Sequence, residues 1–281
     1  MTPTRPIALI TGVSSGIGAA IAVKLVNGEF RVFGTSRAPQ NLPPTPGVET
    51  LAVDVTDDTA VHAAVSEVID RAGRIDVLVN NAGLGILGAA EESSIAQARA
   101  LFETNFFGVI RLTNEVLPHM RRRGSGRIVN ISSVLGYLPA PYAALYSASK
   151  HALEGYTESL DHELREYGVR AVLVEPGYTR TAFEANMWDA DRLQAAYADN
   201  RANARAVVAQ KIRSAELPEV VAEATYAAAT DKRVKLRYPA GRQARQLTLL
   251  KRIAPAALLD NGIRKRSGLN KPRSTAVTAN R

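Results

Sequence analysis

Tyr146 and Lys150 stand four residues apart in a stretch whose apolar spacing predicts a helix, so their side chains share one helix face. An ammonium group beside a phenol favours the phenolate, and we expect Lys150 to lower the pKa of Tyr146 from its usual value of about 10. Ser133 precedes them and could donate a hydrogen bond to a substrate oxygen. This combination predicts proton transfer to or from a carbonyl/alcohol pair.

A glycine-rich segment, residues 11–18, reads Thr-Gly-Val-Ser-Ser-Gly-Ile-Gly. It follows the short apolar run 7–10 and opens a helical pattern over 17–25, which is the context that a phosphate-binding loop requires. Glycines let the backbone turn sharply and approach a pyrophosphate, and free N–H groups at the helix start attract its charge. The segment therefore predicts a dinucleotide-binding loop.

The elements that must position these residues alternate along the chain. Apolar runs predict strands, and longer stretches of helical spacing separate them, which indicates a parallel sheet with right-handed crossovers. The predicted strands are 7–10, 31–36, 50–53, 76–79, 127–131, 170–174 and 236–239, and the predicted helices are 17–25, 57–71, 95–120 and 142–167. We expect an α/β fold with a single Rossmann-type, doubly wound parallel sheet of about seven strands and helices on both faces.

The domain organisation expected for residues 1–281 is a single oxidoreductase domain. Its parts are a cofactor and catalytic core over 5–180, a substrate lid over 180–214, a C-terminal helical extension over 240–269, and a disordered tail over 270–281. The tail is assigned on composition, because it has few large apolar groups to bury.

The motifs occur in an order that resembles the short-chain dehydrogenase/reductase family. After the loop come Asp54, the sequence Asn-Asn-Ala-Gly at 80–83, Asn105, Ser133, the Tyr-x-x-x-Lys pair, and Pro-Gly at 176–177. The match covers about 5–180, and residues 146–160 also resemble the 17β-hydroxysteroid dehydrogenase branch. The resemblance implies hydride transfer between nicotinamide and a carbonyl/alcohol pair, and a homodimer or homotetramer. The catalytic residues it implies are Asn105, Ser133, Tyr146 and Lys150.

Two roles follow from the resemblance alone. Asn105 is expected to hold a water that links Lys150 to solvent. Ser133 is favoured over the neighbouring Ser132, because Ser133 has the family's spacing to Tyr146.

The choice of cofactor depends on the end of the second predicted strand. That strand ends Gly-Thr-Ser-Arg at 34–37, without the acid that holds the ribose hydroxyls of NAD. Arg37 could pair with the 2′-phosphate of NADP(H), although it could also be a solvated surface residue. The resemblance places Asp54 at the adenine, Asn81 and Gly83 at its ribose, and Lys150 at the nicotinamide ribose. The expected cofactor-binding residues are Gly12, Ser14, Ser15, Gly16, Ile17, Gly18, Ser36, Arg37, Asp54, Val55, Asn81, Ala82, Gly83, Tyr146, Lys150, Pro176, Gly177 and Thr179.

The lid carries large apolar groups among polar residues. These could cover a lipophilic carbonyl or alcohol substrate that is steroid-, retinoid- or acyl-like, or they could instead pack a helix on the core. The expected substrate-binding residues are Ser133, Tyr137, Tyr142, Tyr146, Phe183, Met187 and Trp188.

The charge is concentrated at the C-terminal end. Residues 232–281 carry 14 Lys or Arg and one acid, a net +13, against +8 for the whole chain, which leaves −5 for residues 1–231. A slightly acidic body without a basic recognition motif argues against nucleic acid. Apolar residues at helical spacing accompany this charge over 247–263. We favour their packing on the core, and the alternative is contact with a membrane surface.

Other classes of function are poorly supported. The chain has no cysteine, and its four histidines lack zinc-ligand spacing, so we expect no metal. No leader or spanning segment is predicted, and we expect a cytoplasmic protein. Residues 12–16 match the Gly-x-Ser-x-Gly motif of serine hydrolases, with Ser14 as nucleophile, but no histidine partner stands out. A non-catalytic NADP-binding sensor would keep the loop and lose the catalytic residues, which are intact here.

Overall fold

The computed structural model describes residues 5–183, 185–267 and 269. Its centre is a seven-stranded sheet in which neighbouring strands pair in parallel, in the order β3-β2-β1-β4-β6-β7-β9. The strands are β1 Ile7–Thr11, β2 Arg31–Ser36, β3 Val48–Ala52, β4 Val77–Asn80, β6 Gly126–Ile131, β7 Val169–Pro176 and β9 Arg237–Ala240. The predicted doubly wound sheet is confirmed.

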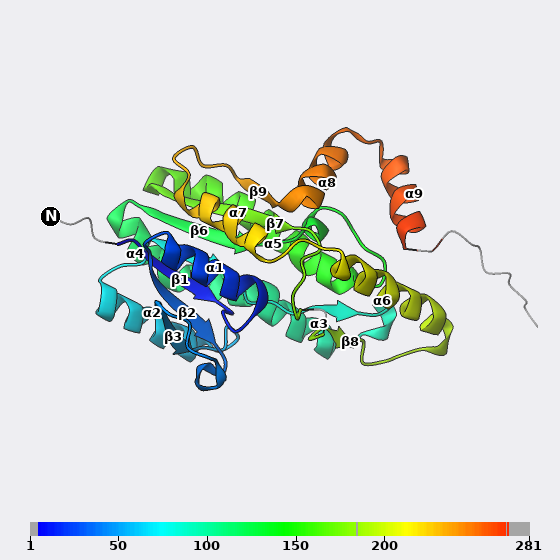
Figure 1. The fold of residues 1–281 in the computed structure, drawn as a ribbon, viewed down its shortest axis with the longest axis horizontal. Coiled ribbons are helices and arrows are strands. Elements are labelled where there is room, and N and C mark those ends of the chain that lie inside the picture. Colours follow the sequence, from blue (N-terminus) through cyan, green and yellow to red (C-terminus); the bar gives the residue numbers. More distant parts are fainter. Residues whose placement is uncertain (1–4, 184, 268, 270–281) are drawn as a thin grey trace, which may run out of the picture.

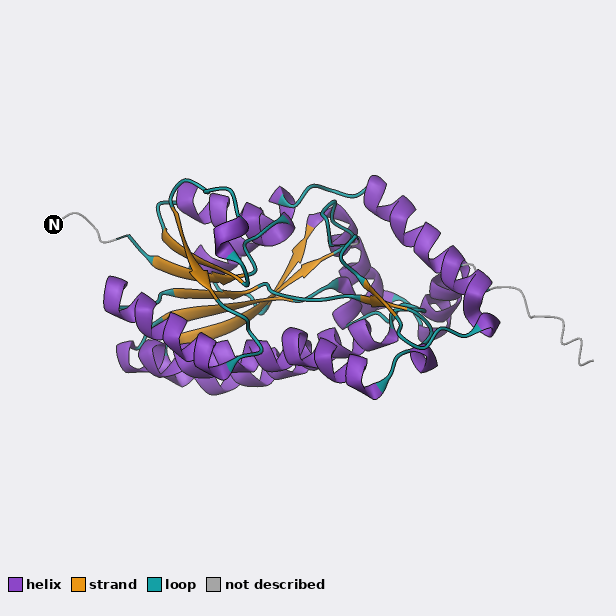
Figure 2. Cartoon of the chain, turned by 90° about the horizontal axis from the view of Figure 1, so that it is seen from below, coloured by secondary structure: helices purple, strands orange, loops and turns teal. Residues whose placement is uncertain are grey.

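Helices cover both faces of the sheet, which lies as a middle layer (Figures 1 and 2). The helices are α1 Gly16–Asn27, α2 Asp58–Ala72, α3 Ile95–Phe102, α4 Gly108–Arg123, α5 Ala144–Leu164, α6 Ala198–Arg213, α7 Glu219–Thr230, α8 Gly241–Ile253 and α9 Ala256–Arg266. Helices α1 and α7 bury their apolar sides in one core, and α2, α4 and α5 bury theirs in the other. Among the helices of the described residues, none has the length and apolarity to cross a bilayer.

The alternation of side chains along a strand assigns each residue to one core. In β1, Ile7 and Leu9 join the α2–α4–α5 core, whereas Ala8 and Ile10 join the α1–α7 core. Because apolar residues fill both faces, the run reads as continuously apolar in the sequence. The carboxyl ends of the strands meet at one edge, where β1 separates the two directions of winding and ligands bind in such folds.

Two predicted helices differ from the observed ones. The stretch expected as one helix over 95–120 is α3 and α4, joined by a π-helical segment, Glu103–Phe107. The helix expected over 142–167 begins at Ala144, because Tyr142 has a positive φ of 64° that is incompatible with a helical start. Gly168 ends this stretch with a φ of 68°, as expected.

The lid and the extension both contribute regular secondary structure. The lid pairs β8, Trp188–Asp189, with β5, Ile86–Leu87, in a small second sheet, and continues into α6. The extension forms α8 and α9, separated at Pro255. The predicted tail over 270–281 lies outside the described residues.

Candidate active site

The glycine-rich loop joins β1 to α1 and adopts a conformation that needs its glycines. Gly12 and Gly16 have φ of 72° and 58°, in the region where other residues are strained. A Cβ on Gly18 would lie 2.1 Å from the Gly12 carbonyl oxygen, so no larger residue fits there. The side chain of Ser15, the residue preceding α1, makes no capping hydrogen bond. The first N–H groups of α1 therefore face the cavity without a side-chain acceptor, as an anion site requires.

The Asn-Ala pair after β4 holds this loop in place. The Asn81 side-chain amide donates to the carbonyl oxygens of Thr11 and Gly12 at 2.9 and 3.0 Å. The backbone N–H groups of Asn81 and Ala82 both donate to the Thr11 hydroxyl oxygen at 2.9 Å. Two neighbouring strand ends are thus joined, and the polar residues after β4 position the loop as well as line the cavity.

One cavity of about 790 Å³ runs along the carboxyl edge of the sheet. Every residue expected to bind cofactor lines it, including Ser36 and Arg37 after β2 and Asp54 and Val55 after β3. The Arg37 side chain is exposed at the rim. The Asp54 carboxylate accepts hydrogen bonds from Thr56 N and Oγ1 at 2.9 and 2.8 Å. Burial opposes ionisation of Asp54, but these bonds and the nearby charge of Arg37 leave its pKa below the usual value.

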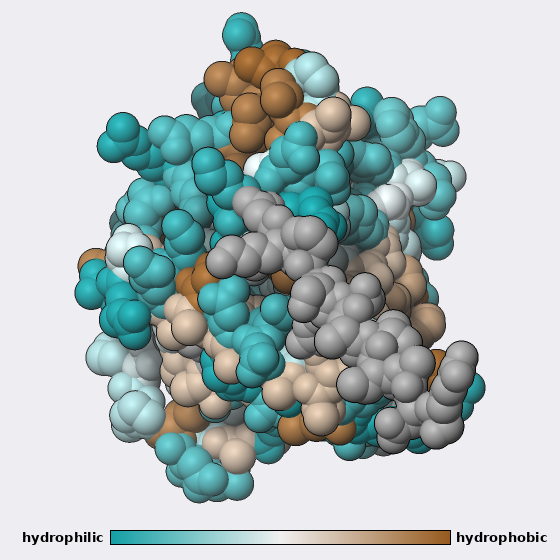
Figure 3. Space-filling model, turned by 90° about the vertical axis from the view of Figure 1, so that its right-hand side faces the viewer, coloured by the Kyte–Doolittle hydropathy of each residue, from teal (hydrophilic) through white to brown (hydrophobic). Residues whose placement is uncertain are grey.

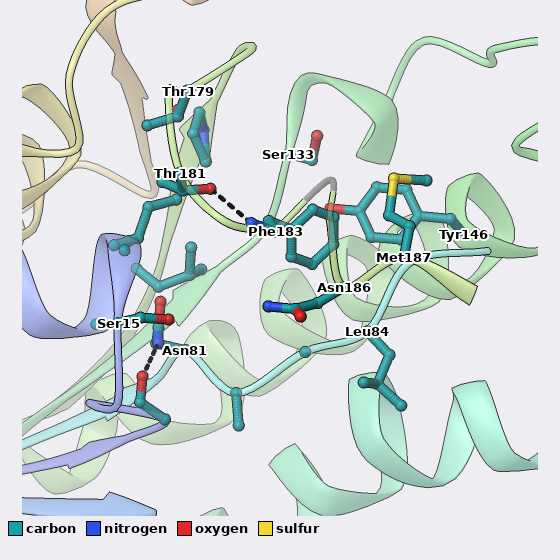
Figure 4. Close-up of a pocket in the computed structure, with 18 of the residues that line it drawn as sticks. Ser15, Asn81, Leu84, Ser133, Tyr146, Thr179, Thr181, Phe183, Asn186 and Met187 are labelled. Carbon is teal, nitrogen blue, oxygen red and sulfur yellow. Dashed lines mark hydrogen bonds between the residues drawn. The ribbon is translucent and has the colours of Figure 1, made fainter. Parts of the chain in front are cut away.

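Ser133, Tyr146 and Lys150 all line this cavity. Figure 4 shows Ser133 and Tyr146 on its wall. Ser133 follows β6, its hydroxyl oxygen accepts from Leu135 N at 3.1 Å, and it lies close enough to the Tyr146 hydroxyl to affect the pKa of that phenol. The neighbouring Ser132 instead donates its hydroxyl to the buried Glu154 carboxylate. The geometry therefore puts the oxygen of Ser133, and not that of Ser132, beside the phenol.

The electrostatics of the Tyr–Lys pair differ from the expectation. Burial raises the pKa of Tyr146 to about 12, and the nearby Ser133 hydroxyl opposes this shift. Burial also lowers the pKa of Lys150 to about 8, against the charge of Glu154. Lys150 Nζ donates to the Ile131 carbonyl oxygen at 2.9 Å and lies 5.8 Å from the Tyr146 ring centre. The predicted lowering of the tyrosine pKa by Lys150 is wrong here, because burial of the phenolate dominates.

Asn105 lies in the π-helical segment between α3 and α4 and is buried. Its side-chain oxygen accepts from Leu84 N at 2.7 Å, and its amide donates to the Leu84 carbonyl oxygen and to Ser149 Oγ at 2.9 and 3.1 Å. Such π-helical turns are frequent at functional sites. Here the wide turn brings Asn105 to the segment after β4, next to α5. Its role in holding a water remains a prediction.

The lid forms the opposite wall of the cavity. The Phe183 ring centre lies 6.0 Å from that of Tyr146, and Met187 lies beside the same phenol (Figure 4). Gly85 makes room for both lid side chains, because a Cβ there would lie 2.9 Å from Met187 Cγ and 3.0 Å from Phe183 Cε1. Trp188 also lines the cavity.

Two residues expected to line the substrate site opposite the lid lie elsewhere. Neither Tyr137 nor Tyr142 is among the described residues that line the cavity. The Tyr137 hydroxyl is hydrogen-bonded to Thr248 of α8 at 2.9 Å, and the positive φ of Tyr142 sets it apart from α5. Sequence reasoning missed lining residues from α6 and after α9, namely Ala204, Val207, Val208, Ile212 and Ser267. Their spacing in α6 is that of an apolar stripe, but only the position of the lid shows what the stripe faces.

Polar side-chain contacts anchor the lid to the segment before α3. The Glu92 carboxylate is buried, accepts from Gln194 N at 2.8 Å and forms an ion pair with Arg201 of α6. The Asp191 carboxylate accepts from Ser94 N and Oγ at 2.7 and 2.5 Å. These contacts join residues about one hundred positions apart, so no local pattern in the sequence reveals them.

The cavity offers little to a serine hydrolase. Ser14 is exposed on the loop, and no histidine is among the described residues that line the cavity. His151, the histidine nearest in sequence to Tyr146, is bonded through Nδ1 to the Ser147 carbonyl oxygen. Ser14 therefore lacks a base, and the match to the hydrolase motif reflects the glycines of the loop.

Comparison with known proteins defines the class. A family model described as short chain dehydrogenase matches residues 6–192. The chain is 45% identical over 181 residues to 3-ketodihydrosphingosine reductase of Bacteroides thetaiotaomicron, covering 64% of this chain and 66% of that protein. It is 42% identical over 193 residues to human 17-beta-hydroxysteroid dehydrogenase type 1, covering 64% and 58%. The chain thus spans less than two thirds of the length of either relative.

Two solved structures extend the similarity to nearly the whole chain. A short-chain dehydrogenase from Streptomyces avermitilis superposes with a TM-score of 0.80 and 33% identity, covering 97% of this chain and 100% of that one. A short chain dehydrogenase from Burkholderia cenocepacia J2315, in complex with NADP, gives 0.74 and 25%, with coverage of 97% and 100%. The chain belongs to the short-chain dehydrogenase/reductase family of oxidoreductases, which confirms the resemblance of its motifs.

Proposed function

We propose that this chain is an NADP(H)-dependent oxidoreductase that interconverts a carbonyl and a primary or secondary alcohol on a lipophilic substrate, with Tyr146 as the acid/base. The observation that carries the proposal is that Ser133 and Tyr146 line the same cavity as the apolar side chains of Phe183 and Met187, with the Phe183 ring centre 6.0 Å from that of Tyr146. A proton donor and a surface for an apolar substrate thereby face each other.

The residues at the other end of the cavity fit a dinucleotide with a 2′-phosphate. The open start of α1 and the close approach permitted by Gly18 suit a pyrophosphate. Arg37 supplies a cation at the end of β2, where no acid would repel a phosphate. The relative from Burkholderia cenocepacia is described in complex with NADP, which agrees with this choice. When bound, such a cofactor supplies the hydride.

The protein residues supply the proton chemistry. At neutral pH the Tyr146 phenol is protonated, because burial raises its pKa to about 12, and it can give its proton to a carbonyl oxygen during reduction. Ser133 can donate a hydrogen bond to the same oxygen and stabilise the charge that develops on it. Lys150, whose pKa burial lowers to about 8, is poised to exchange protons near neutrality and to return one towards Tyr146. In the oxidation direction the same groups act in reverse.

The substrate class follows from the lid. Phe183, Met187 and Trp188, with the apolar stripe of α6, offer a surface for a long or polycyclic hydrocarbon body. The two curated relatives named above carry the names of a sphingoid-base reductase and a steroid dehydrogenase, which are both lipophilic classes. We infer a steroid-, retinoid- or acyl-like carbonyl compound, and we retain the expectations of a cytoplasmic homodimer or homotetramer.

A panel of carbonyl compounds tests the proposal. NADPH and NADH oxidation would be followed with lipophilic ketones and aldehydes of steroid, retinoid and long-chain acyl type, beside small polar sugars of matched carbonyl reactivity. We expect turnover with NADPH and at least one lipophilic compound, and little with the sugars. Tight NADPH binding without turnover on any compound would instead support a non-catalytic NADP-binding sensor. Preference for sugars would overturn the substrate class.

A further inference from the structure

The junction of α8 and α9 presents large apolar side chains to solvent. Leu249, Leu250, Ile253 and Leu258, which we call the apolar corner, are 60%, 41%, 71% and 65% exposed. Figure 3 shows an apolar cluster at the top of the molecule, where Figure 1 places the α8–α9 junction. The expectation that the leucines of the extension pack on the core is therefore wrong for these residues. Exposed apolar groups that gather in one place mark interaction sites.

The local sequence explains why these side chains face outward. Helix α8 packs on the body through Gly241 and Ala244, which are small and buried, so its larger apolar residues lie on the remaining faces. Pro255 ends the helical run, and α9 then turns back towards α6 without burying any residue. The apolar corner thus stands at the junction, away from the cores of the sheet.

The two helices that form the apolar corner are rich in cations. Helices α8 and α9 together carry seven Lys or Arg residues and one acid, Asp260. The cations are Arg242, Arg245, Lys251, Arg252, Arg264, Lys265 and Arg266, and all seven are exposed. The ion pairs among the described residues are made by other cations, such as Arg201 and Arg237. The charge of the two helices is therefore available to a partner.

We propose that the apolar corner and its cations dock on an anionic membrane surface, with the apolar corner entering the headgroup boundary and the cations contacting lipid phosphates. An apolar face flanked by Lys and Arg has this preference. A second copy of the chain fits less well, because a two-fold symmetric contact would place like-charged helices against each other. The membrane surface satisfies both the apolar groups and the charge.

Docking at this place would bring the cavity to the lipid. Ser267, directly after α9, lines the cavity, and its carbonyl oxygen accepts from Asn203 Nδ2 of α6 at 3.2 Å. The extension is therefore connected to the same rim as the lid. This second step rests on the proposed function, because a lipophilic substrate dissolved in the bilayer would then lie near the mouth of its site. Docking itself requires no catalysis.

Vesicle sedimentation of the full-length protein tests the docking. We expect the protein to sediment with vesicles of phosphatidylcholine and phosphatidylserine, and far less with phosphatidylcholine alone. Binding should weaken at high salt, because the attraction to phosphates is screened. Two variants distinguish the contribution of the cations from that of the apolar side chains. Lys251→Gln/Arg252→Gln should weaken partitioning by about 30-fold, and Ile253→Asp/Leu258→Asp should abolish it at any salt concentration.

A matched control separates the site from general basicity. Lys232 and Arg233 are exposed and precede β9, so they lie at the opposite end of that strand from α8. Lys232→Gln/Arg233→Gln removes the same charge, and we expect partitioning to stay within about twofold of the parent. Equal weakening in both charge variants would overturn the docking site, as would an absence of sedimentation with the anionic vesicles.

Light scattering distinguishes the other occupant. If Ile253→Asp/Leu258→Asp reduces the molar mass in solution and the parent does not bind vesicles, the apolar corner is a contact between copies and the proposal is overturned. Turnover of a soluble ketone without detergent tests the proposed function independently of docking. A parent protein that turns over the ketone but does not bind vesicles would contradict the docking proposal and leave the proposed function intact. A parent protein that binds vesicles but does not turn over the ketone would contradict the proposed function and leave the docking proposal intact.

Discussion

The two sides of the cavity are built by different means. On the cofactor side, residues 11–18 and 80–83 follow neighbouring parallel strands, and hydrogen bonds from Asn81 to the backbone of Thr11 and Gly12 fix their spacing. On the substrate side, the lid runs over the surface and is held by side-chain contacts such as the Glu92–Arg201 ion pair. The cofactor side depends on the sheet, whereas the lid depends on a few polar side-chain contacts, among them those of the buried Glu92 carboxylate.

This difference predicts that substitutions on the two sides of the cavity have different kinetic effects. Substitutions on the cofactor side should affect every substrate equally, because each turnover uses the same proton donor and dinucleotide. Substitutions in the lid should change the apparent affinity for bulky substrates and leave cofactor binding intact. The predictions below test this separation, beginning with the largest expected effect.

Tyr146→Phe should lower kcat by about 100- to 10,000-fold for every substrate, because the proton donor is lost. NADPH binding, followed by fluorescence titration, should be nearly unchanged, since the ring that packs against Phe183 remains. Tyr226→Phe is a control, because Tyr226 packs against Phe30 on the opposite face of the sheet. Substantial carbonyl reduction by folded Tyr146→Phe would refute the mechanism.

Lys150→Ala should impair both NADPH binding and turnover, because we assign it to both. The pH profile sharpens this expectation. Burial lowers the pKa of Lys150 to about 8, so turnover of the parent enzyme should change across that pH if Lys150 returns protons to Tyr146. The profile should lose this transition in Lys150→Ala. A transition that persists there would assign it to another group.

Arg37→Asp should weaken NADPH binding by about 10- to 100-fold and bring NADH closer to parity, because a charge-assisted pair is replaced by repulsion. Titration of both cofactors against the parent and the variant measures the effect. Arg233→Asp, an exposed change before β9, controls for net charge. A parent that binds NADH as tightly as NADPH would show the NADP assignment to be wrong.

Arg201→Gln tests the substrate side. It leaves the buried Glu92 carboxylate without its cation, which loosens the attachment of α6. We expect KM for a bulky substrate to rise by about tenfold, with the NADPH dissociation constant unchanged. Arg205→Gln is a matched control on the same helix, because its pair with Asp189 is largely exposed and contributes little. A parallel loss of NADPH affinity in Arg201→Gln would break the separation of the two sides.

The sequence was most informative where function depends on local backbone geometry. The loop over 11–18 and the Tyr146–Lys150 spacing need neighbouring residues only, and the structure brings them to the same cavity. The features that the sequence did not predict depend on contacts between residues far apart in the chain. The pKa of Tyr146 depends on burial that no spacing reveals, and Tyr142 adopts a positive φ where the pattern continued the helix. The lid anchor at Glu92 joins parts of the chain that show no common pattern.

In the C-terminal extension, the sequence predicted the helices but not the direction in which their apolar side chains point. The apolar spacing over 247–263 predicted helices, and α8 and α9 confirm them. Amphipathic spacing does not say whether the apolar face meets the core or solvent, because both arrangements need the same periodicity. The fully buried residues of α8 are the small Gly241 and Ala244, whereas Leu249, Leu250 and Ile253 are exposed.

Two buried carboxylates lie next to the active site and share one cation. Glu154 and Glu175 both form ion pairs with the Arg237 guanidinium, and the Glu154 carboxylate also accepts a hydrogen bond from the Ser132 hydroxyl. Within the described residues, Glu175 Oε2 has no hydrogen-bond partner. Burial and the charge of Glu154 raise the pKa of Glu175 from 4.5 to about 7, with Arg237 opposing. The folded protein therefore binds this proton more tightly than the unfolded chain does.

Glu175→Gln should consequently gain stability relative to the parent as the pH rises. In the parent, the free energy of unfolding loses the contribution of the protonated carboxyl between pH 4.5 and about 7, since Glu175 must ionise while buried. The glutamine cannot ionise, and its amide can occupy the position of the protonated oxygen. We expect the difference between variant and parent to grow by about 1–3 kcal/mol from acidic to mildly alkaline pH in urea unfolding. Glu158→Gln, which alters a half-exposed partner of the same Arg237, should change it far less. A difference that stays constant with pH would place the ionisation elsewhere in the molecule.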